Sequence, residues 1–333
     1  MLAAVFEAEG RLSMEERPLP VLASADDILI AVEACGICGT DLQILASPPG
    51  HPATPGTVLG HELVGRVVEA GAAAGIALGT RVVIDADPKC GVCGPCRTGR
   101  PASCLNVQAL GIFRDGALAS HVLAPAGAAY PISDAVPAPV AALVEPLACV
   151  VNGTRRAAPR AGESVLIYGG GAIGCLFLAV FRATGCSPIV VVEPLAARAG
   201  VARAMGADAV VAPEEVVATL PGWLPGGADI VVDAVGSQLA SAIEAAAMGA
   251  RIVLFGMNSN ARPPIHQVEI TEKSLAILGS YISNFTFPEA IRLLESGRLL
   301  VDPMISAVMP LAESRDAFEL LRSGGATKVV ITP

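Results

Sequence analysis

The stretch VLIYGGGAIG constrains the fold of this chain more than any other. An apolar run typical of a buried strand leads directly into a turn that carries Gly169, Gly171 and Gly174 in the pattern GxGxxG, and a helix-like run follows. The first glycine allows the tight turn, the second lets the backbone approach a pyrophosphate, and the third brings the helix against the strand. Because the free N–H groups of the helix N-terminus attract phosphates, the stretch predicts a dinucleotide-binding turn.

A second strand-like run, IVVVEP, ends at Glu193, 19 residues after Gly174. A carboxylate at this place accepts hydrogen bonds from the ribose hydroxyls of adenosine and repels a 2′-phosphate, which favours NAD over NADP. A surface glutamate at a strand end is the purely structural alternative. With Ala172 and Ile173 in the turn and Arg198 after the second strand, these residues make up the predicted cofactor site.

The order of apolar runs along the chain predicts a β-rich domain and a doubly wound α/β domain. Early runs such as DILIAVEACG and TRVVIDAD have a period of two and are separated by glycine and proline, which is typical of a β-rich domain with long loops. From about residue 146, Val/Ile-rich strands alternate with helical runs such as QLASAIEAAAMGA, which predicts a doubly wound parallel sheet. The strand-like tail TKVVITP returns to the first domain. We therefore expect one domain over 1–145 and 285–333 and a second over 146–284.

Four cysteines lie close together in PKCGVCGPCRTGRPASC, with the spacing C-x2-C-x2-C-x7-C. Short spacings with intervening glycines let the thiolates converge on one ion, and four sulfurs saturate zinc, so such a site holds a loop and leaves no position for a substrate. An iron–sulfur cluster is the alternative, but no proline follows the last cysteine and no second cluster motif is present. The stretch predicts a structural zinc on the following residues: Cys90, Cys93, Cys96 and Cys104.

A second set of metal-binding residue types is scattered through the first domain, in ACGICGTD, GHELVG and VEPLAC. Cys38 offers a soft sulfur, His61 a nitrogen, and Glu62 and Glu145 offer carboxylate oxygens. A catalytic zinc needs about three protein ligands and one open position. Each residue alone also has a structural explanation, as a core, turn or helix-start residue. The remaining cysteines are assigned to the core, and His51 is assigned to a loop.

Composition excludes several classes of function. The net charge is −9 and only three lysines occur, so no basic block is available for a nucleic-acid backbone. The N-terminal run MLAAVFEAEGR has no basic region of the kind that begins a signal peptide, and the longest strictly apolar run is half the length that a membrane crossing needs. We expect a cytoplasmic protein that contacts neither membrane nor nucleic acid, with its nine cysteines as thiols and metal ligands.

These motifs, in this order, resemble those of zinc-dependent medium-chain alcohol and polyol dehydrogenases. GICGTD, GHE, the four-cysteine stretch, EPLAC and GGGAIG span essentially the whole chain, and the branch with sorbitol, arabinitol and threonine dehydrogenases is the most similar. The resemblance implies a GroES-like β-rich catalytic domain and a Rossmann NAD-binding domain. It also implies two zinc ions per subunit, a small alcohol as substrate, and a homo-oligomer, either a dimer or a tetramer.

The resemblance assigns roles at the second metal site and marks two departures. It implies that Cys38 and His61 bind a catalytic zinc, that Glu62 is a direct or exchanging ligand, and that Glu145 binds directly or through water. Thr40 matches the hydroxyl of the family's proton relay. Gln43 replaces a histidine that often continues this relay, and a glutamine cannot act as a general base. His121 also stands where the family usually has another residue, either at the substrate pocket or as a structural strand residue.

The expected reaction is hydride transfer between NAD and a secondary alcohol of a polyol or cyclitol. L-Threonine and aminocyclitols such as 2-deoxy-scyllo-inosamine are rival substrates, and a non-catalytic NAD-binding protein is the alternative from another class. In LGIFRDG, Phe113 is expected to wall the substrate pocket. Arg114 and Asp115 follow in the same loop, where a local turn pair is the structural alternative.

Overall fold

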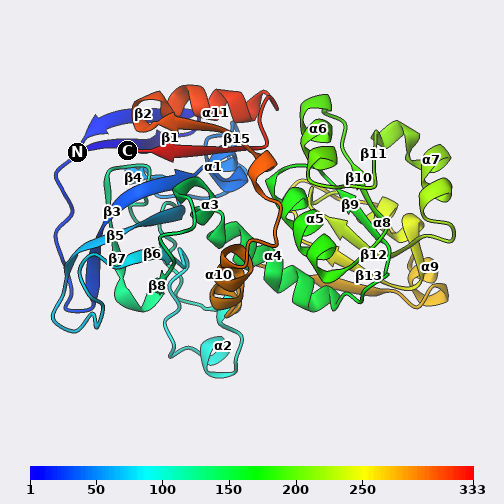
Figure 1. Cartoon of the computed structure of the whole chain (residues 1–333), viewed down its shortest axis with the longest axis horizontal. Helices are drawn as coiled ribbons and strands as arrows, with labels where there is room; N and C mark the ends of the chain where they lie inside the picture. The colour runs from blue at the N-terminus through cyan, green and yellow to red at the C-terminus, as the bar shows by residue number, and fades with distance from the viewer.

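A computed structural model describes all 333 residues, which form two halves connected through helix α4 (Val144–Ala157) (Figure 1). One half contains a seven-stranded, largely antiparallel sheet, and the other contains a six-stranded parallel sheet. The predicted fold class, a β-rich unit beside a doubly wound parallel sheet, is confirmed.

The first half is organised around β3, a ten-residue strand that is buried along most of its length. β5 pairs with one edge of β3, and β7 and β16 share the other. β16 returns from the end of the chain, so the last residues contribute to the same sheet as the first hundred. The strands of this half are β1 (Leu2–Ala8), β2 (Arg11–Glu16), β3 (Asp27–Gly36), β4 (Thr57–Val58), β5 (Glu62–Ala70), β6 (Arg81–Ile84), β7 (His121–Pro125), β8 (Ala129–Pro131), β15 (Ile305–Pro310) and β16 (Lys328–Thr332).

The second half has the strand order β11–β10–β9–β12–β13–β14. Successive side chains of a strand point to opposite faces of the sheet. Val165 and Ile167 of β9 accordingly pack with α4, α5 and α6, whereas Leu166 and Tyr168 pack with α7 and α8. Both faces are thus covered, as the continuous Val/Ile runs predict. The strands are β9 (Val165–Tyr168), β10 (Ile189–Val192), β11 (Ala209–Val211), β12 (Ala228–Asp233), β13 (Ala246–Leu254) and β14 (Ala276–Gly279).

The helices are short, and one ends earlier than its sequence predicts. They are α1 (Gly39–Ile44), α2 (Gly94–Arg97), α3 (Ala138–Ala141), α4, α5 (Ala172–Thr184), α6 (Ala196–Ala204), α7 (Val216–Trp223), α8 (Leu239–Ala245), α9 (Gln267–Glu272), α10 (Phe287–Glu295) and α11 (Ser314–Arg322). QLASAIEAAAMGA was expected to be helical throughout, but α8 ends at Ala245 and β13 begins at once. The ammonium group of Lys273 donates to the carbonyls of Ile243, Glu244 and Ala246 at 2.8, 2.9 and 3.2 Å, which caps the helix at this point.

None of the helices combines the length and the apolar character that a bilayer crossing requires.

Candidate functional site

Cys38, His61 and Glu62 converge on one point, with their ligand atoms all within 4.8 Å of one another. Cys38 is the N-cap residue of α1, His61 directly precedes β5, and Glu62 is the first residue of that strand. His61 and Glu62 are buried, and Cys38 is half-buried. Sulfur, nitrogen and oxygen donors of this kind are the ligand set that zinc prefers.

Asp41 lies behind His61 and was not among the predicted site residues. Its Oδ2 accepts the Cys38 N–H at 2.8 Å, and its Oδ1 lies 3.6 Å from His61 Nδ1. Neither Oδ1 nor Nδ1 has a hydrogen-bond partner, although both are buried. A carboxylate at the far nitrogen of a histidine is a usual orienting partner at metal sites and leaves Nε2 to face the metal. The unpartnered Oδ1 of Asp41 and Nδ1 of His61 therefore fit the arrangement of a zinc-binding histidine and its orienting carboxylate.

Charges around His61 favour its cationic form when no metal is present. Burial lowers the pKa of His61, but attraction to Asp41 and Cys38 outweighs this effect and raises the pKa well above its usual value. Burial also raises the pKa of the Asp41 carboxyl, against the opposing attraction of His61. The site thus concentrates negative charge where a cation has to bind.

Lys328 of β16 is the second residue that sequence reasoning missed. Its ammonium group forms an ion pair with Glu62 and donates to the Ile37 carbonyl at 2.9 Å. A Cβ atom on Gly36 would collide with the Glu62 carboxylate and with the lysine side chain, so the pair needs a glycine here. Burial lowers the pKa of Lys328, but Glu62 raises it above its ordinary value, so the lysine stays charged. Lys328 therefore occupies Oε2 of the Glu62 carboxylate, and a metal bound by Glu62 would share this carboxylate with the lysine.

Glu145 lies in the first turn of α4. Burial raises its pKa to about 7, against the attraction of His61, and the Cys149 thiol donates to its Oε1 at 3.4 Å. Glu145 is not within the 4.8 Å cluster that Cys38, His61 and Glu62 form. Its direct contact with zinc stays a prediction.

The four-cysteine stretch folds as a lobe around its own sulfur atoms. The ligand atoms of Cys90, Cys93, Cys96 and Cys104 all lie within 4.8 Å of one another. Backbone N–H groups point at the sulfurs, from Cys93 to Cys90 Sγ at 3.4 Å and from Cys90 to Cys104 Sγ at 3.4 Å. N–H···S bonds stabilise thiolates, so the lobe fits the predicted structural zinc.

The glycine turn has the geometry that its pattern predicts. Gly169 has a φ of +100°, in the left-handed region that favours glycine. A Cβ atom on Gly174 would collide with the Gly169 carbonyl, so the close approach of α5 to the turn needs this glycine. Gly171 is the N-cap residue of α5, which leaves the first N–H groups of the helix free for a phosphate.

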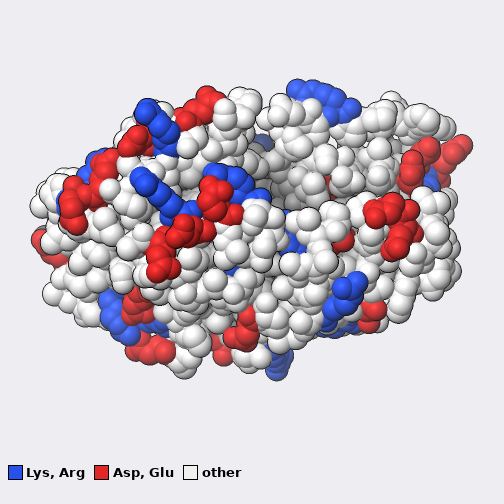
Figure 2. Space-filling view, turned by 90° about the horizontal axis from the view of Figure 1, so that it is seen from above, with Lys and Arg blue, Asp and Glu red and all other residues white.

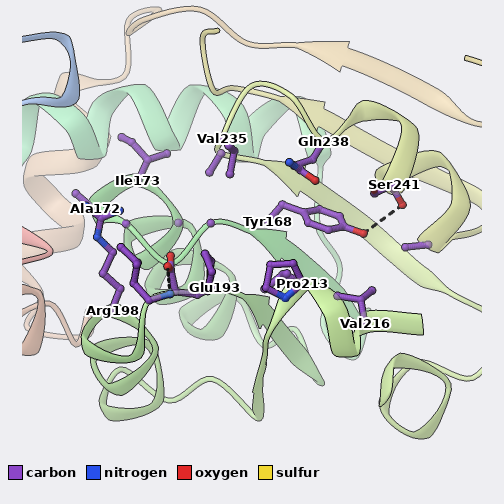
Figure 3. Close-up of a pocket in the computed structure, with 18 of the residues that line it drawn as sticks. Tyr168, Ala172, Ile173, Glu193, Arg198, Pro213, Val216, Val235, Gln238 and Ser241 are labelled. Carbon is purple, nitrogen blue, oxygen red and sulfur yellow. Dashed lines mark hydrogen bonds between the residues drawn. The ribbon is translucent and has the colours of Figure 1, made fainter. Parts of the chain in front are cut away.

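Glu193 lies beside this turn, with its carboxylate fixed by backbone N–H groups. Gly170 donates to Oε2 and Leu195 donates to Oε1, both at 2.8 Å. Figure 3 shows Glu193 between the turn and Arg198, with Ala172 and Ile173 on the far side of the turn. The structure thus brings together all the residues predicted to hold a dinucleotide.

A single cavity of about 1010 Å³ connects the two sites. Its lining includes Cys38 and Glu62 of the metal-ligand cluster, the glycines Gly169, Gly171 and Gly174 of the turn, and Glu193 and Arg198. Figure 2 shows the corresponding hollow between the two halves of the molecule. Two residues of the metal-ligand cluster and the dinucleotide turn therefore line the same cavity.

Other predicted residues lie outside this lining. Thr40 is half-buried on α1, between Gly39 and Asp41. Phe113 packs against the core of the β-rich half, so its part in the substrate pocket stays a prediction. Arg114, Asp115 and His121 line a separate pocket of about 180 Å³.

Both parts of the chain match family models. Residues 24–134 match the alcohol dehydrogenase GroES-like domain, and residues 172–296 match the zinc-binding dehydrogenase domain. The chain is 34% identical to an L-threonine 3-dehydrogenase of Pyrococcus abyssi (strain GE5 / Orsay), over 91% of this chain and 90% of the relative. It is 32% identical to a probable D-xylulose reductase A of Arthroderma otae, over 99% and 96% of the two chains.

The fold matches that of solved dehydrogenases. A solved zinc-binding dehydrogenase from Sinorhizobium meliloti 1021, bound to NADP, superposes with a TM-score of 0.92 at 35% identity, over 100% of this chain and 99% of that one. The cleft unites a metal-ligand cluster with a dinucleotide turn, in the two domains that the family models describe. The chain therefore belongs to the zinc-dependent medium-chain alcohol and polyol dehydrogenases, oxidoreductases that combine a GroES-like and a Rossmann domain.

Proposed function

We propose that the protein oxidises a secondary alcohol of a polyol or cyclitol to the ketone, with NAD as hydride acceptor. The continuous cavity between Cys38 and Glu193 carries this proposal, because it allows an alcohol at one end to meet the nicotinamide of a dinucleotide that lies along the groove. Cys38, His61 and a glutamate would hold the catalytic zinc, and the four-cysteine lobe a second, structural zinc. The catalytic zinc supplies a Lewis acid that lowers the pKa of the substrate hydroxyl.

The chain's own residues position the reactants and move the proton. Asp41 fixes the ring of His61, and Lys328 holds the carboxylate of Glu62 beside it. Thr40 takes the hydroxyl proton and passes it outward, while the substrate carbon transfers its hydride to the nicotinamide. Because Gln43 cannot accept a proton, the proton then leaves through water or a ribose hydroxyl.

Glu193 supports NAD as the preferred cofactor. Its buried carboxylate is fixed by Gly170 and Leu195, so it can accept hydrogen bonds from ribose hydroxyls but repels a 2′-phosphate. Arg198 lines the same cavity and attracts phosphate, and the solved relative from Sinorhizobium meliloti holds NADP. We expect Glu193→Ser to reduce the preference for NAD over NADP, as measured by the ratio of kcat/KM values for the two cofactors.

The relatives support two substrate classes, and one experiment distinguishes them. D-xylulose reductase supports a polyol, and L-threonine 3-dehydrogenase supports an amino alcohol. The experiment offers sugar alcohols, cyclitols, aminocyclitols, L-threonine and short secondary alcohols to the zinc-loaded enzyme with NAD and follows the reduced cofactor by absorbance. Preference for a polyol or cyclitol supports the proposal, and preference for L-threonine or an aminocyclitol replaces it. If NAD binds, the catalytic zinc is absent and no compound leads to reduced cofactor, the result favours a non-catalytic protein.

We also propose that the protein is a homo-oligomer and that it resides in the cytoplasm. β14 is an edge strand, and Tyr281 and Phe285 beyond it are 53% and 67% exposed. An open edge with exposed aromatic side chains is a surface that proteins usually cover. All nine cysteines are free, which suits a reducing compartment. Light scattering of the purified protein tests the oligomer.

A further inference from the structure

One hydrogen bond crosses the cleft between the two halves of the molecule and is not explained by the proposed chemistry. Gln43 Nε2 donates to the Met257 carbonyl at 3.2 Å. Gln43 lies on α1 in the β-rich half, and Met257 lies in the loop between β13 and α9 in the parallel-sheet half. The two residues are 214 positions apart in the sequence.

Gln43 and Met257 each belong to a segment that contacts residues of the cleft. α1 starts after Cys38, whose N–H is held by Asp41 beside His61. On the other side, the loop that carries Met257 packs so closely on Gly236 that a Cβ atom there would lie 2.7 Å from the Gly256 backbone. Gly236 follows two residues that line the cavity, Ala234 and Val235.

The Gln43–Met257 bond links the helix of the metal-ligand cluster to the loop that supports the cofactor side of the cleft. It is one of the contacts that hold the two sides together.

The Gln43 side chain is held in position, but its bond is open to solvent. The Gly50 N–H donates to the main-chain carbonyl of Gln43 at 2.9 Å, which holds the 46–50 loop against α1. A Cβ atom on Gly50 would lie 3.3 Å from Gln43 Cβ, so this loop packs against the Gln43 side chain. Because the bond itself is solvent-exposed, water can replace either partner when the halves separate. The Gln43–Met257 hydrogen bond can therefore form and break without disturbing the core.

We propose that Gln43 is an interdomain latch, which holds the cleft closed over the bound cofactor and slows its release. Gln43 is thus a positioning residue and carries no proton. A second contact crosses the same cleft, because Gly324 packs so tightly on Leu195 that a Cβ atom on the glycine would lie 2.6 Å from the leucine side chain. The inference rests on the proposed function only in taking the bound ligand to be a nicotinamide dinucleotide.

The test measures release of reduced NAD from the zinc-loaded enzyme by stopped-flow fluorescence, with no alcohol present. Gln43→Glu keeps the shape of the side chain but replaces the donor with a charge that repels the Met257 carbonyl, and Gln43→Ala removes the contact altogether. The matched control is Gln267→Glu, the same change at an exposed glutamine with no side-chain hydrogen bond. We expect both Gln43 variants to release the cofactor about two- to fivefold faster, the size of one modest hydrogen bond, and the control to match the parent.

The outcomes separate the latch from other roles. Unchanged release from both Gln43 variants, even with a lower thermal midpoint, would overturn the latch and leave a structural contact. Unchanged release with a displaced pH profile of kcat in Gln43→Ala would also overturn it, because Gln43 would then act on the reaction and not on cofactor release. Because release is measured without turnover, an enzyme that binds reduced NAD but oxidises no alcohol contradicts the proposed function and not the latch. An enzyme that binds no nicotinamide cofactor overturns both.

Discussion

The ammonium group of Lys328 pairs with the carboxylate of Glu62 in the interior, where the two side chains are 2% and 1% exposed. The residues are 266 positions apart and belong to the last strand of the chain and to β5. Lys328 also holds the Ile37 carbonyl, next to Cys38. The C-terminal strand thus secures two components of the predicted metal site.

Removing the lysine should leave an uncompensated charge in the core. We expect Lys328→Met to reduce the free energy of unfolding by about 3–5 kcal/mol, because a buried carboxylate without its partner pays its full desolvation cost. Denaturant unfolding of the metal-free protein measures this loss. The double variant with Glu62→Gln should recover much of the lost stability, whereas additive losses would contradict a coupled pair.

Asp41 should act through the orientation of His61. We expect Asp41→Asn to weaken zinc binding at the catalytic site by about 10- to 100-fold, the usual effect of losing such a carboxylate. Competition with a chelator measures the affinity, and the zinc of the four-cysteine lobe serves as an internal reference. Asp26→Asn, at an exposed aspartate, is the matched control. Equal affinities for the two variants would show that Asp41 does not orient the histidine.

Glu145 should make the metal-free protein sensitive to pH. Burial raises its pKa from 4.5 to about 7, so the folded protein binds this proton more tightly than the unfolded chain does. The resulting stabilisation is complete below the unfolded pKa and is lost as the pH rises through the folded pKa. Between about pH 5 and 8, the thermal midpoint of the chelator-treated parent should therefore fall more steeply than that of Glu145→Gln. Parallel curves for the two proteins would contradict this effect.

The four-cysteine lobe should bind zinc more tightly as the pH rises. Backbone N–H groups of Val92 and Cys93 lower the pKa of Cys90 to about 6, whereas burial raises that of Cys96 to about 12. Zinc binding must therefore release the Cys96 proton. Chelator competition at several pH values between about 6 and 8 measures the trend, and a constant affinity would contradict it.

Cys96→Ser should lower the thermal midpoint but leave turnover at the other site.

Local patterns were sufficient to predict the fold class, and they indicated residues that the structure brings together in two metal-ligand clusters and a glycine turn. The alternating Val/Ile strands reflect a sheet covered on both faces, and the glycines at Gly169 and Gly174 reflect contacts that no side chain allows. Asp41 had a weak local signal, its position three residues after Cys38, where a side chain can cap a helix. That signal indicates a helix start and says nothing about a histidine from another strand.

Lys328 had no local signal beyond being one of three lysines, because its partner is determined by how the last strand joins the sheet. The end of α8 depended in the same way on a distant residue, Lys273. The replacement at Gln43 predicted what the residue cannot do, but its contact with Met257 depends on how the two halves pack. Tertiary contacts of this kind leave no periodic trace in the sequence.

The most direct test compares the zinc-loaded parent with Cys38→Ser. Reduced cofactor is followed with NAD and the best alcohol of the substrate panel, and NAD binding and zinc content are measured on the same samples. We expect the parent to turn over, whereas the variant should bind NAD, keep the lobe zinc, lose the other zinc and show no turnover. Undiminished turnover by Cys38→Ser would contradict a catalytic zinc held at Cys38 and His61.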